Sequence, residues 1–344
     1  MAYTTINKST DYFNTKLWTG TGSSNALTGV GFQPDWTWIK NRTDGNSHVL
    51  QDAVRGVGNT IISNNSDAQA AEGAGDLTAF GSDGFTVGTN GRVNGSGKSM
   101  VAWNWKANGA GSANTDGSIS STVSANTTSG FSIVSYTGTG SAATIGHGLG
   151  VSPACIIIKN TSDSGGVDWF VYHQSTGATN RTKLNQTVAS ATSSFINNTT
   201  PSPTVFNTEG GGASGVNANN YIAYCFAEKQ GYSKFGSYTG NGNADGTFVY
   251  TGFKPAFVMT KKTSGTSSWD MHDTKRDTFN VATKHLLAED GGAEGSTVVL
   301  DILSNGFKFR TSNGDRNAPG ETYIYMAFAE APLVGSNNVP TTAR

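Results

Sequence analysis

The chain has 344 residues, with 23 basic and 24 acidic side chains and a net charge of −1. This balance excludes a basic surface that would attract nucleic acid, and the sequence has no polybasic run and no apolar run of about 18 residues that would indicate membrane binding or insertion. The 45 glycines are spread between short apolar runs, which favours many tight turns between strands. We therefore expect an all-β protein with little helix. The polar first ten residues predict no signal peptide.

One pattern occurs three times along the chain. The copies begin "LWTGTGSSNALTGVGFQPDWTWIKN" at Leu17, "SYTGTGSAATIGHGLGVSPACIIIKN" at Ser135 and "FGSYTGNGNADGTFVYTGFKPAFVMTKK" at Phe235. Each has a Gly-x-Gly turn, then a proline, then an apolar β-rich run with a lysine six residues after the proline. The prolines are Pro34, Pro153 and Pro255, and the lysines are Lys40, Lys159 and Lys261. A catalytic site usually occurs once, so this repetition indicates a copied folding unit.

A second strand follows in each copy: "HVLQD" from His48, "WFVYH" from Trp169 and "WDMHD" from Trp269. Copies one and three place an arginine three residues after the acid (Asp52 with Arg55, Asp273 with Arg276). Copy two has His173 at the position of the acid. We therefore expect that this pair has no role common to all three copies.

The last strand is the most alike: "MVAWNWK" from Met100, "YIAYCFAEK" from Tyr221 and "YIYMAFAE" from Tyr323. Side chains two residues apart lie on the same face of a strand. The aligned large side chains should therefore form the core of each unit. They are Trp103, Tyr224 and Met326, followed by Trp105, Phe226 and Phe328.

The spacing of the copies predicts three tandem β-sandwich modules that fold independently, at residues 1–110, 117–230 and 232–334, and a polar tail at 335–344. The glycine-rich stretch from Ala107 has the composition of a linker, and "SISSTVSAN" from Ser118 resembles an extra leading strand. The best helical pattern covers 278–290.

Three oxygen-bearing residues, Asn241, Asn243 and Asp245, alternate before Gly246 as at the start of a calcium loop. The twelfth position, where a bidentate Glu belongs, is Gly252. The alternatives are a weak metal site and a tight turn. No zinc-protease or nucleophile-elbow motif occurs, and we expect neither a catalytic site nor a cofactor.

Three aromatic residues, Trp169, Trp269 and Tyr232, are candidates for glycan contact because rings can stack on the apolar faces of sugars. The competing interpretation is core packing, which is the common role of large aromatic side chains. Cys155 and Cys225 lie in apolar strands and are expected to be buried thiols. The sequence leaves open whether they are close in space.

Four stretches, "IGHGLGVSP", "YCFAEKQGYSKFGSYTGNG", "YTGFKPAFVM" and "YIYMAFAEAPLVGSNNVP", resemble a repeated-domain family encoded among the structural genes of marine tailed bacteriophages. Members are often labelled tail-fibre-like or concanavalin-A-like. The resemblance covers nearly the whole chain and carries no catalytic signature. It implies a virion protein, assembled in the bacterial cytoplasm, with lectin-like sandwich modules of the jelly-roll type.

Two functions follow as expectations. The first is a non-enzymatic decoration or accessory protein on the particle surface, which forms homo-oligomers and contacts other phage structural proteins. The alternative is a tail fibre or receptor-binding protein that recognises host surface glycans. The sequence has no heptad pattern for a trimeric shaft. Neither function involves nucleic acid or membrane insertion.

Overall fold

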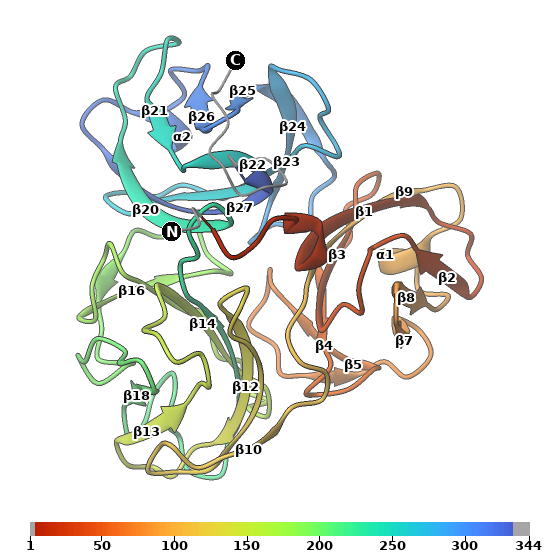
Figure 1. Cartoon of the computed structure of the whole chain (residues 1–344). Coiled ribbons are helices and arrows are strands. Elements are labelled where there is room, and N and C mark those ends of the chain that lie inside the picture. Colours follow the sequence, from red (N-terminus) through yellow and green to blue (C-terminus); the bar gives the residue numbers. More distant parts are fainter. Residues whose placement is uncertain (1–3, 333–344) are drawn as a thin grey trace.

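A computed structural model describes residues 4–332 of the chain. Strands make up 45% of the structure and helices 3%, which confirms the predicted all-β class. Each of the three large sheets takes its strands from one copy of the repeat, and all their strand pairs are antiparallel. Figure 1 shows the three units grouped around a common centre. We call residues 8–107, 108–229 and 230–332 the first, second and third modules.

The first module combines a large sheet, in the order β1-β9-β3-β4-β5-β6, with a small sheet, β2-β8-β7. Its elements are η1 (Ser9–Asp11), β1 (Phe13–Thr19), β2 (Asn25–Thr28), β3 (Trp36–Asn41), β4 (Val49–Asp52), β5 (Asn59–Ile62), β6 (Ala70–Ala71), β7 (Leu77–Gly81), β8 (Gly84–Val87), α1 (Gly91–Asn94) and β9 (Ser99–Trp105). The proline of the repeat precedes β3, where its missing N–H removes no ladder hydrogen bond.

The second module has the order β10-β11-β12-β19-β14-β15-β16-β17, with a small sheet β13-β18. Its strands are β10 (Ser112–Asn114), β11 (Ser121–Asn126), β12 (Phe131–Thr137), β13 (Ala143–Gly146), β14 (Cys155–Asn160), β15 (Phe170–His173), β16 (Asn180–Lys183), β17 (Ala191–Thr192), β18 (Val205–Thr208) and β19 (Asn220–Phe226). The extra leading strand is β11. The stretch predicted as a linker contains β10, which pairs with β11 at the sheet edge.

The third module forms one curled sheet in the order β20-β27-β22-β23-β24-β25-β26-β21. Its elements are β20 (Ser233–Thr239), β21 (Phe248–Tyr250), β22 (Phe253–Lys262), β23 (Trp269–Asp273), β24 (Ala282–Leu287), β25 (Gly295–Leu303), β26 (Gly306–Phe309), α2 (Gly314–Asn317) and β27 (Thr322–Pro332). The helical expectation for 278–290 is wrong, because β24 pairs with strands on both sides. The predicted tail at 335–344 lies outside the described residues.

Each module buries one face of its main sheet under its own outer strands. The outer clusters contain Ile39 and Phe85 in the first module, Ile158 and Phe206 in the second, and Val258 and Phe307 in the third. This packing of two β layers is consistent with the predicted sandwich architecture.

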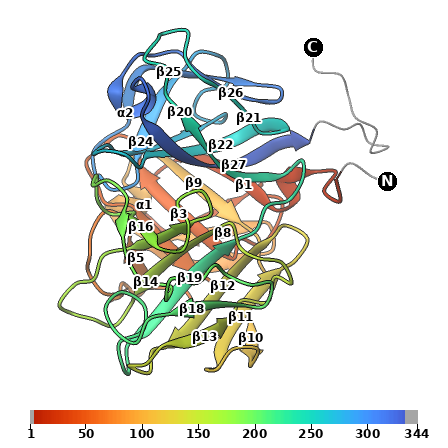
Figure 2. The same ribbon diagram turned by 90° about the vertical axis from the view of Figure 1, so that its left-hand side faces the viewer.

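The other face of every main sheet enters a single core shared by the three modules. The ring centroids of Trp36 and Tyr224 lie 4.2 Å apart, and those of Phe226 and Phe328 lie 5.8 Å apart. Figure 2 shows β22 and β27 lying against β1 and β9, and Phe13 stacks on Phe328 at 5.3 Å. The expectation of modules with separate cores is therefore wrong. The aligned aromatic side chains of the last strands pack between modules rather than inside each one.

Candidate functional site

The repeated lysines are buried at the boundaries between modules. Each lies in the middle of a main sheet, and its Nζ donates to a backbone carbonyl of a different module. The pairs are Lys40 with Gly291 at 3.0 Å, Lys159 with Ser66 at 2.7 Å, and Lys261 with Thr187 at 2.8 Å. Burial lowers the pKa of all three ammonium groups to about 8. The first module thus bonds to the third, the third to the second, and the second to the first.

Two of the three glycan candidates belong to the same boundaries. Trp169 and Trp269 are 0% and 4% exposed. The indole N–H of Trp169 donates to Ile62 O in the first module, and that of Trp269 donates to Lys183 O in the second, both at 2.8 Å. The third candidate, Tyr232, is 1% exposed and packs edge-on against Phe328. The structure corrects these candidates, because none presents a ring face to a sugar from solvent.

The acids of the first and third copies, for which the second copy has a histidine, also form hydrogen bonds between modules. Asp52 accepts from Tyr224 Oη at 2.8 Å, and Asp273 accepts from Trp103 Nε1 at 3.0 Å. Each of these acids also accepts from its own arginine. The arginine bonds are Arg55 Nε to Asp52 at 2.6 Å and Arg276 Nε to Asp273 at 2.5 Å.

In the second module His173 replaces the acid, and the residue that aligns with Tyr224 and Trp103 is Met326, whose thioether has no proton to donate. His173 Nε2 lies 3.1 Å from Tyr325 O. Burial lowers the pKa of His173 to about 4, so the ring is neutral near pH 7. The residue at this position therefore differs between the copies because each copy faces a different group in the neighbouring module: a phenol, a thioether or an indole N–H.

The residues of the calcium-loop pattern form a turn. Asn241 Oδ1 accepts from the backbone N–H of Asn243, and Asn243 Oδ1 accepts from that of Asp245, both at 3.0 Å. Asn317 also donates to Asn241 Oδ1, and Asp245 pairs with Lys308 at 2.6 Å. Across residues 4–332 no group of three acidic, His or Cys side chains is arranged to hold a metal ion. These bonds fit the turn interpretation.

The two cysteines lie on adjacent strands, β14 and β19, but on opposite faces. Cys155 belongs to the shared core and Cys225 to the outer cluster of the second module. Both thiols are free, and burial raises the pKa of each. They are inert packing residues, as the sequence indicates.

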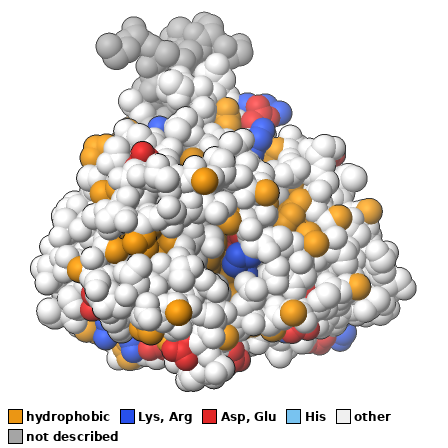
Figure 3. Space-filling view, turned by 90° about the horizontal axis from the view of Figure 1, so that it is seen from below, with side chains coloured by type: hydrophobic (Ala, Val, Ile, Leu, Met, Phe, Trp, Pro, Cys, Tyr) orange, Lys and Arg blue, Asp and Glu red, His pale blue; other side chains and the backbone are white. Residues whose placement is uncertain are grey.

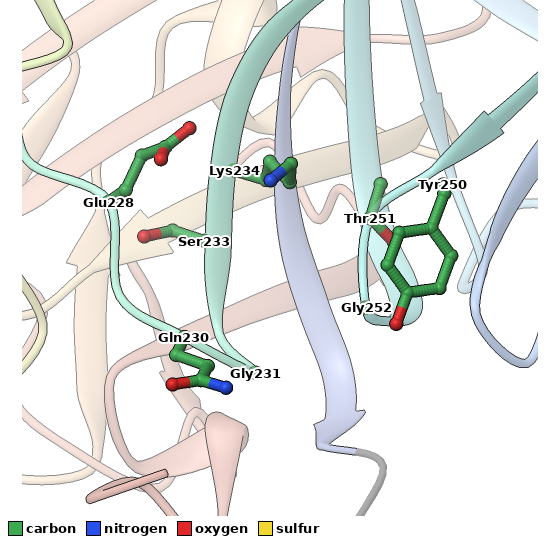
Figure 4. A pocket seen from close by; sticks show the side chains of 8 residues that line it. All are labelled: Glu228, Gln230, Gly231, Ser233, Lys234, Tyr250, Thr251 and Gly252. Carbon is green, nitrogen blue, oxygen red and sulfur yellow. The ribbon is translucent and has the colours of Figure 1, made fainter. Parts of the chain in front are cut away.

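An open cleft of about 490 Å³ lies where the second module meets the third, and apart from Glu228 its lining residues belong to the third module. Figure 4 shows Glu228 and Gln230 on one side of β20, Tyr250 on the other side, and Lys234 between them. Sequence analysis missed these residues. The "FVY" of β21 could have indicated them. It places two aromatic side chains at positions where the first copy has Ala26 and Thr28 and the second copy has Thr144 and Gly146.

A second cleft of the third module, of about 320 Å³, is lined by Asp270, His285, Asp315 and Arg316 among others. Arg316 donates to Asp270 from Nε, and from Nη2 at 3.2 Å. The pKa of Asp270 is nevertheless raised by burial. His272 Nε2 lies 3.6 Å from Asp270 Oδ1, and burial with the nearby Arg316 charge lowers the pKa of His272 well below its usual value. Asp270 and His272 are only 3% and 1% exposed, so with Arg316 they form a buried polar network at the wall of the cleft.

Fold and site together define an all-β protein in which the repeated motif joins modules and two open polar clefts are lined largely by the third module. A model of the DUF7483 family, a domain of unknown function, matches residues 8–332, and the chain belongs to this family. One family domain thus spans all three modules. No curated protein and no solved structure matches the chain.

The helices within residues 4–332 are too short and too polar to cross a bilayer. Figure 3 shows one face of the molecule, where apolar side chains occur singly or in small groups, charged side chains of both signs occur near the margin, and a basic side chain lies near the middle. Scattered apolar residues of this kind are normal on a protein surface.

Proposed function

We propose that the chain is a non-enzymatic structural protein displayed on the surface of a tailed-bacteriophage particle as a decoration or accessory component. The observation that supports it best is the shared core, which joins three modules into one block. Within this block the lysines, acids and tryptophans of the repeat bond one module to the next. A repeat used in this way serves as a scaffold, whereas catalysis would need some of these groups to be accessible to a substrate.

Phage particles provide the direct test of this proposal. Virions of the phage that encodes the chain are purified by density gradient, and the chain is counted by quantitative mass spectrometry against the major capsid protein. Hundreds of copies per particle would support a head decoration protein, and a few to tens would support a tail component. Particles that lack the chain would refute the proposal. Antibody labelling of intact particles then shows whether the chain is exposed.

Turnover is tested separately. The purified chain is incubated with host surface polysaccharide, and new reducing ends are measured. Cleavage that disappears when Asp270 or Glu228 is changed to the amide would show that the protein is an enzyme. Unchanged polysaccharide is the expected result. Sedimentation of the same sample tests the proposed self-association.

A receptor-binding protein for host glycans is the second candidate function. One observation favours it: the exposed aromatic side chains of the described residues, Phe248, Tyr250 and Phe279, all belong to the third module. Aromatic rings are enriched at recognition surfaces because they combine a large apolar face with little conformational freedom.

A further inference from the structure

The three modules close the same gap in different ways. This gap lies between the first long strand of a module (β1, β12 or β20) and the segment that follows β2, β13 or β21. In the first module Asn14 of β1 spans the gap, because its side-chain amide donates to Val30 O at 2.9 Å. In the second module β11 fills the gap, and a Cβ added at Gly148 would lie only 3.0 Å from Val123 Cγ1.

In the third module the gap stays open. Ser233 pairs with Phe328 as Phe13 pairs with Trp105, so Lys234 takes the place of Asn14. No hydrogen bond or ion pair within residues 4–332 holds the ammonium of Lys234. The result is the cleft of about 490 Å³, a volume within the range of small-molecule sites.

Tyr250 stands at the edge of this cleft with 56% of its surface exposed. It faces Gly306 across the strand pair. The equivalent residue is Thr28 in the first module, where it faces Gly84, and Gly146 in the second module, where it faces Val205. The three copies share a fold, so a ring needed for packing would be expected in more than one of them. This ring is present only where the gap is open, which is the pattern expected of a ligand contact.

The polar groups of the cleft differ in how firmly they are held. Glu228 Oε1 accepts from Gln174 Nε2 at 3.1 Å and from the backbone N–H of Phe235 at 2.9 Å, so its carboxylate is fixed. The side-chain amide of Gln230 and the ammonium of Lys234 have no bond to other residues of the described chain. The cleft therefore offers a preorganised acceptor, two groups that can adapt to a ligand, and a phenol ring.

The chemistry of these groups selects a class of ligand. A phosphate or other strong anion would meet the fixed carboxylate of Glu228, and a cation would meet Lys234, so neither is favoured in a cleft with one charge of each sign. A flat apolar ligand would cover the ammonium of Lys234 without offering it a hydrogen-bond partner. A neutral saccharide satisfies both demands, because it presents C–H groups to a ring face and hydroxyl groups to donors and acceptors.

We propose that this cleft is a saccharide-binding subsite, in which Tyr250 stacks on a sugar ring and Glu228, Gln230 and Lys234 bond its hydroxyl groups. The subsite rests on the proposed function only for its biological setting, which is exposure of the third module on the assembled particle. Binding itself is a property of the purified chain.

The test uses the full chain and a defined set of probes: cellobiose, maltose, chitobiose, and the neutral and acidic oligosaccharides released from host surface polysaccharide by mild hydrolysis. Saturation-transfer NMR detects contact, and calorimetry gives the affinity. We expect at least one neutral probe to bind. Tyr250→Ala should weaken binding by about tenfold, the loss expected for a stacked ring.

Phe248→Ala is the matched control, because Phe248 is 44% exposed on the same strand but does not line the cleft. It should leave the affinity unchanged, and Lys234→Met should weaken binding without changing the fold. Failure of every probe, binding of acidic probes alone, or equal losses for Tyr250→Ala and Phe248→Ala would overturn the subsite. Each of these outcomes leaves the copy number on virions unaffected, so the subsite and the proposed structural role fail independently.

Discussion

The hydroxyl of Tyr224 in the second module donates a 2.8 Å hydrogen bond to Oδ2 of Asp52 in the first module. Both groups are buried, and Arg55 Nε donates to the same carboxylate oxygen at 2.6 Å. Burial, with the Asp52 charge as the second cause, raises the pKa of Tyr224 well above its usual value, so the phenol keeps its proton. This bond is one of several that join two modules that the sequence presents as separate units.

Tyr224→Phe should lower the free energy of unfolding by about 1–3 kcal/mol, because it removes a donor from a buried charged acceptor. Chemical denaturation with global fitting measures the loss. Tyr250→Phe is the control, since that hydroxyl is exposed and its removal should cost less than about 0.5 kcal/mol. Equal effects for the two variants would show that the bond between modules contributes nothing.

The exchange of Asp for His in the second module predicts a coupling between two residues. His173→Asp buries a carboxylate that faces Met326 and keeps the backbone N–H of Ser175 as a donor, but has neither an arginine nor a donor from the neighbouring module, and we expect a cost of about 3–5 kcal/mol. Met326→Tyr supplies the phenol found at the corresponding position of the second module. In the double variant the two costs should not add, and a double-mutant cycle should give a favourable coupling of about 1 kcal/mol or more. Additive costs would mean that the divergence has another cause.

The lysines at the module boundaries predict a pH dependence. The pKa of Lys159 falls from 10.5 to about 8 on burial, so between these values the unfolded chain binds more protons than the folded chain. The lysine therefore costs folding stability at low pH, and this cost decreases as pH rises from about 8 toward 10.5. Buried Tyr and Cys side chains with raised pKa act in the opposite sense above about pH 9.

A comparison of variants separates these effects. The stability of the natural chain relative to Lys159→Met should increase between pH 7.5 and 9, when both are measured by denaturant unfolding. A difference that does not change with pH for Lys159→Met would contradict the linkage.

Much of the fold could be predicted from residue pattern alone. Proline entrances and period-2 aromatic residues placed β3, β14 and β22 and their partners β9, β19 and β27. The packing partners of the apolar strand faces could not be predicted. The alternation of apolar residues indicates that Trp105 and Phe328 are buried, but it does not indicate which residues bury them. A lysine inside a strand usually indicates an exposed position. Apart from their recurrence, nothing in the sequence predicts that Lys40 and its equivalents are buried. The cleft could not be predicted, because its residues come from two separate segments, 228–234 and 250–252, and the sequence does not show that the gap filled in the other modules stays open here.

The shared core makes a final prediction about cutting the chain. The sequence alone suggested that fragments divided between Asn108 and Gly117 would fold separately. The structure indicates the opposite for the first fragment, because separation would expose Trp36, Trp38 and Trp105, which are each 1% exposed in the intact chain. It would also remove the partners of Asp52 and of Trp103. We expect the isolated fragments to aggregate or to melt without cooperativity, since large exposed apolar patches are association sites.

Mixing the two fragments should restore a single cooperative transition, detected by near-ultraviolet circular dichroism of the buried tryptophans. A matched mixture in which the second fragment carries Tyr224→Phe should reassociate more weakly. Fragments that each melt cooperatively on their own, with no gain on mixing, would contradict the shared core and return the protein to three independent sandwiches.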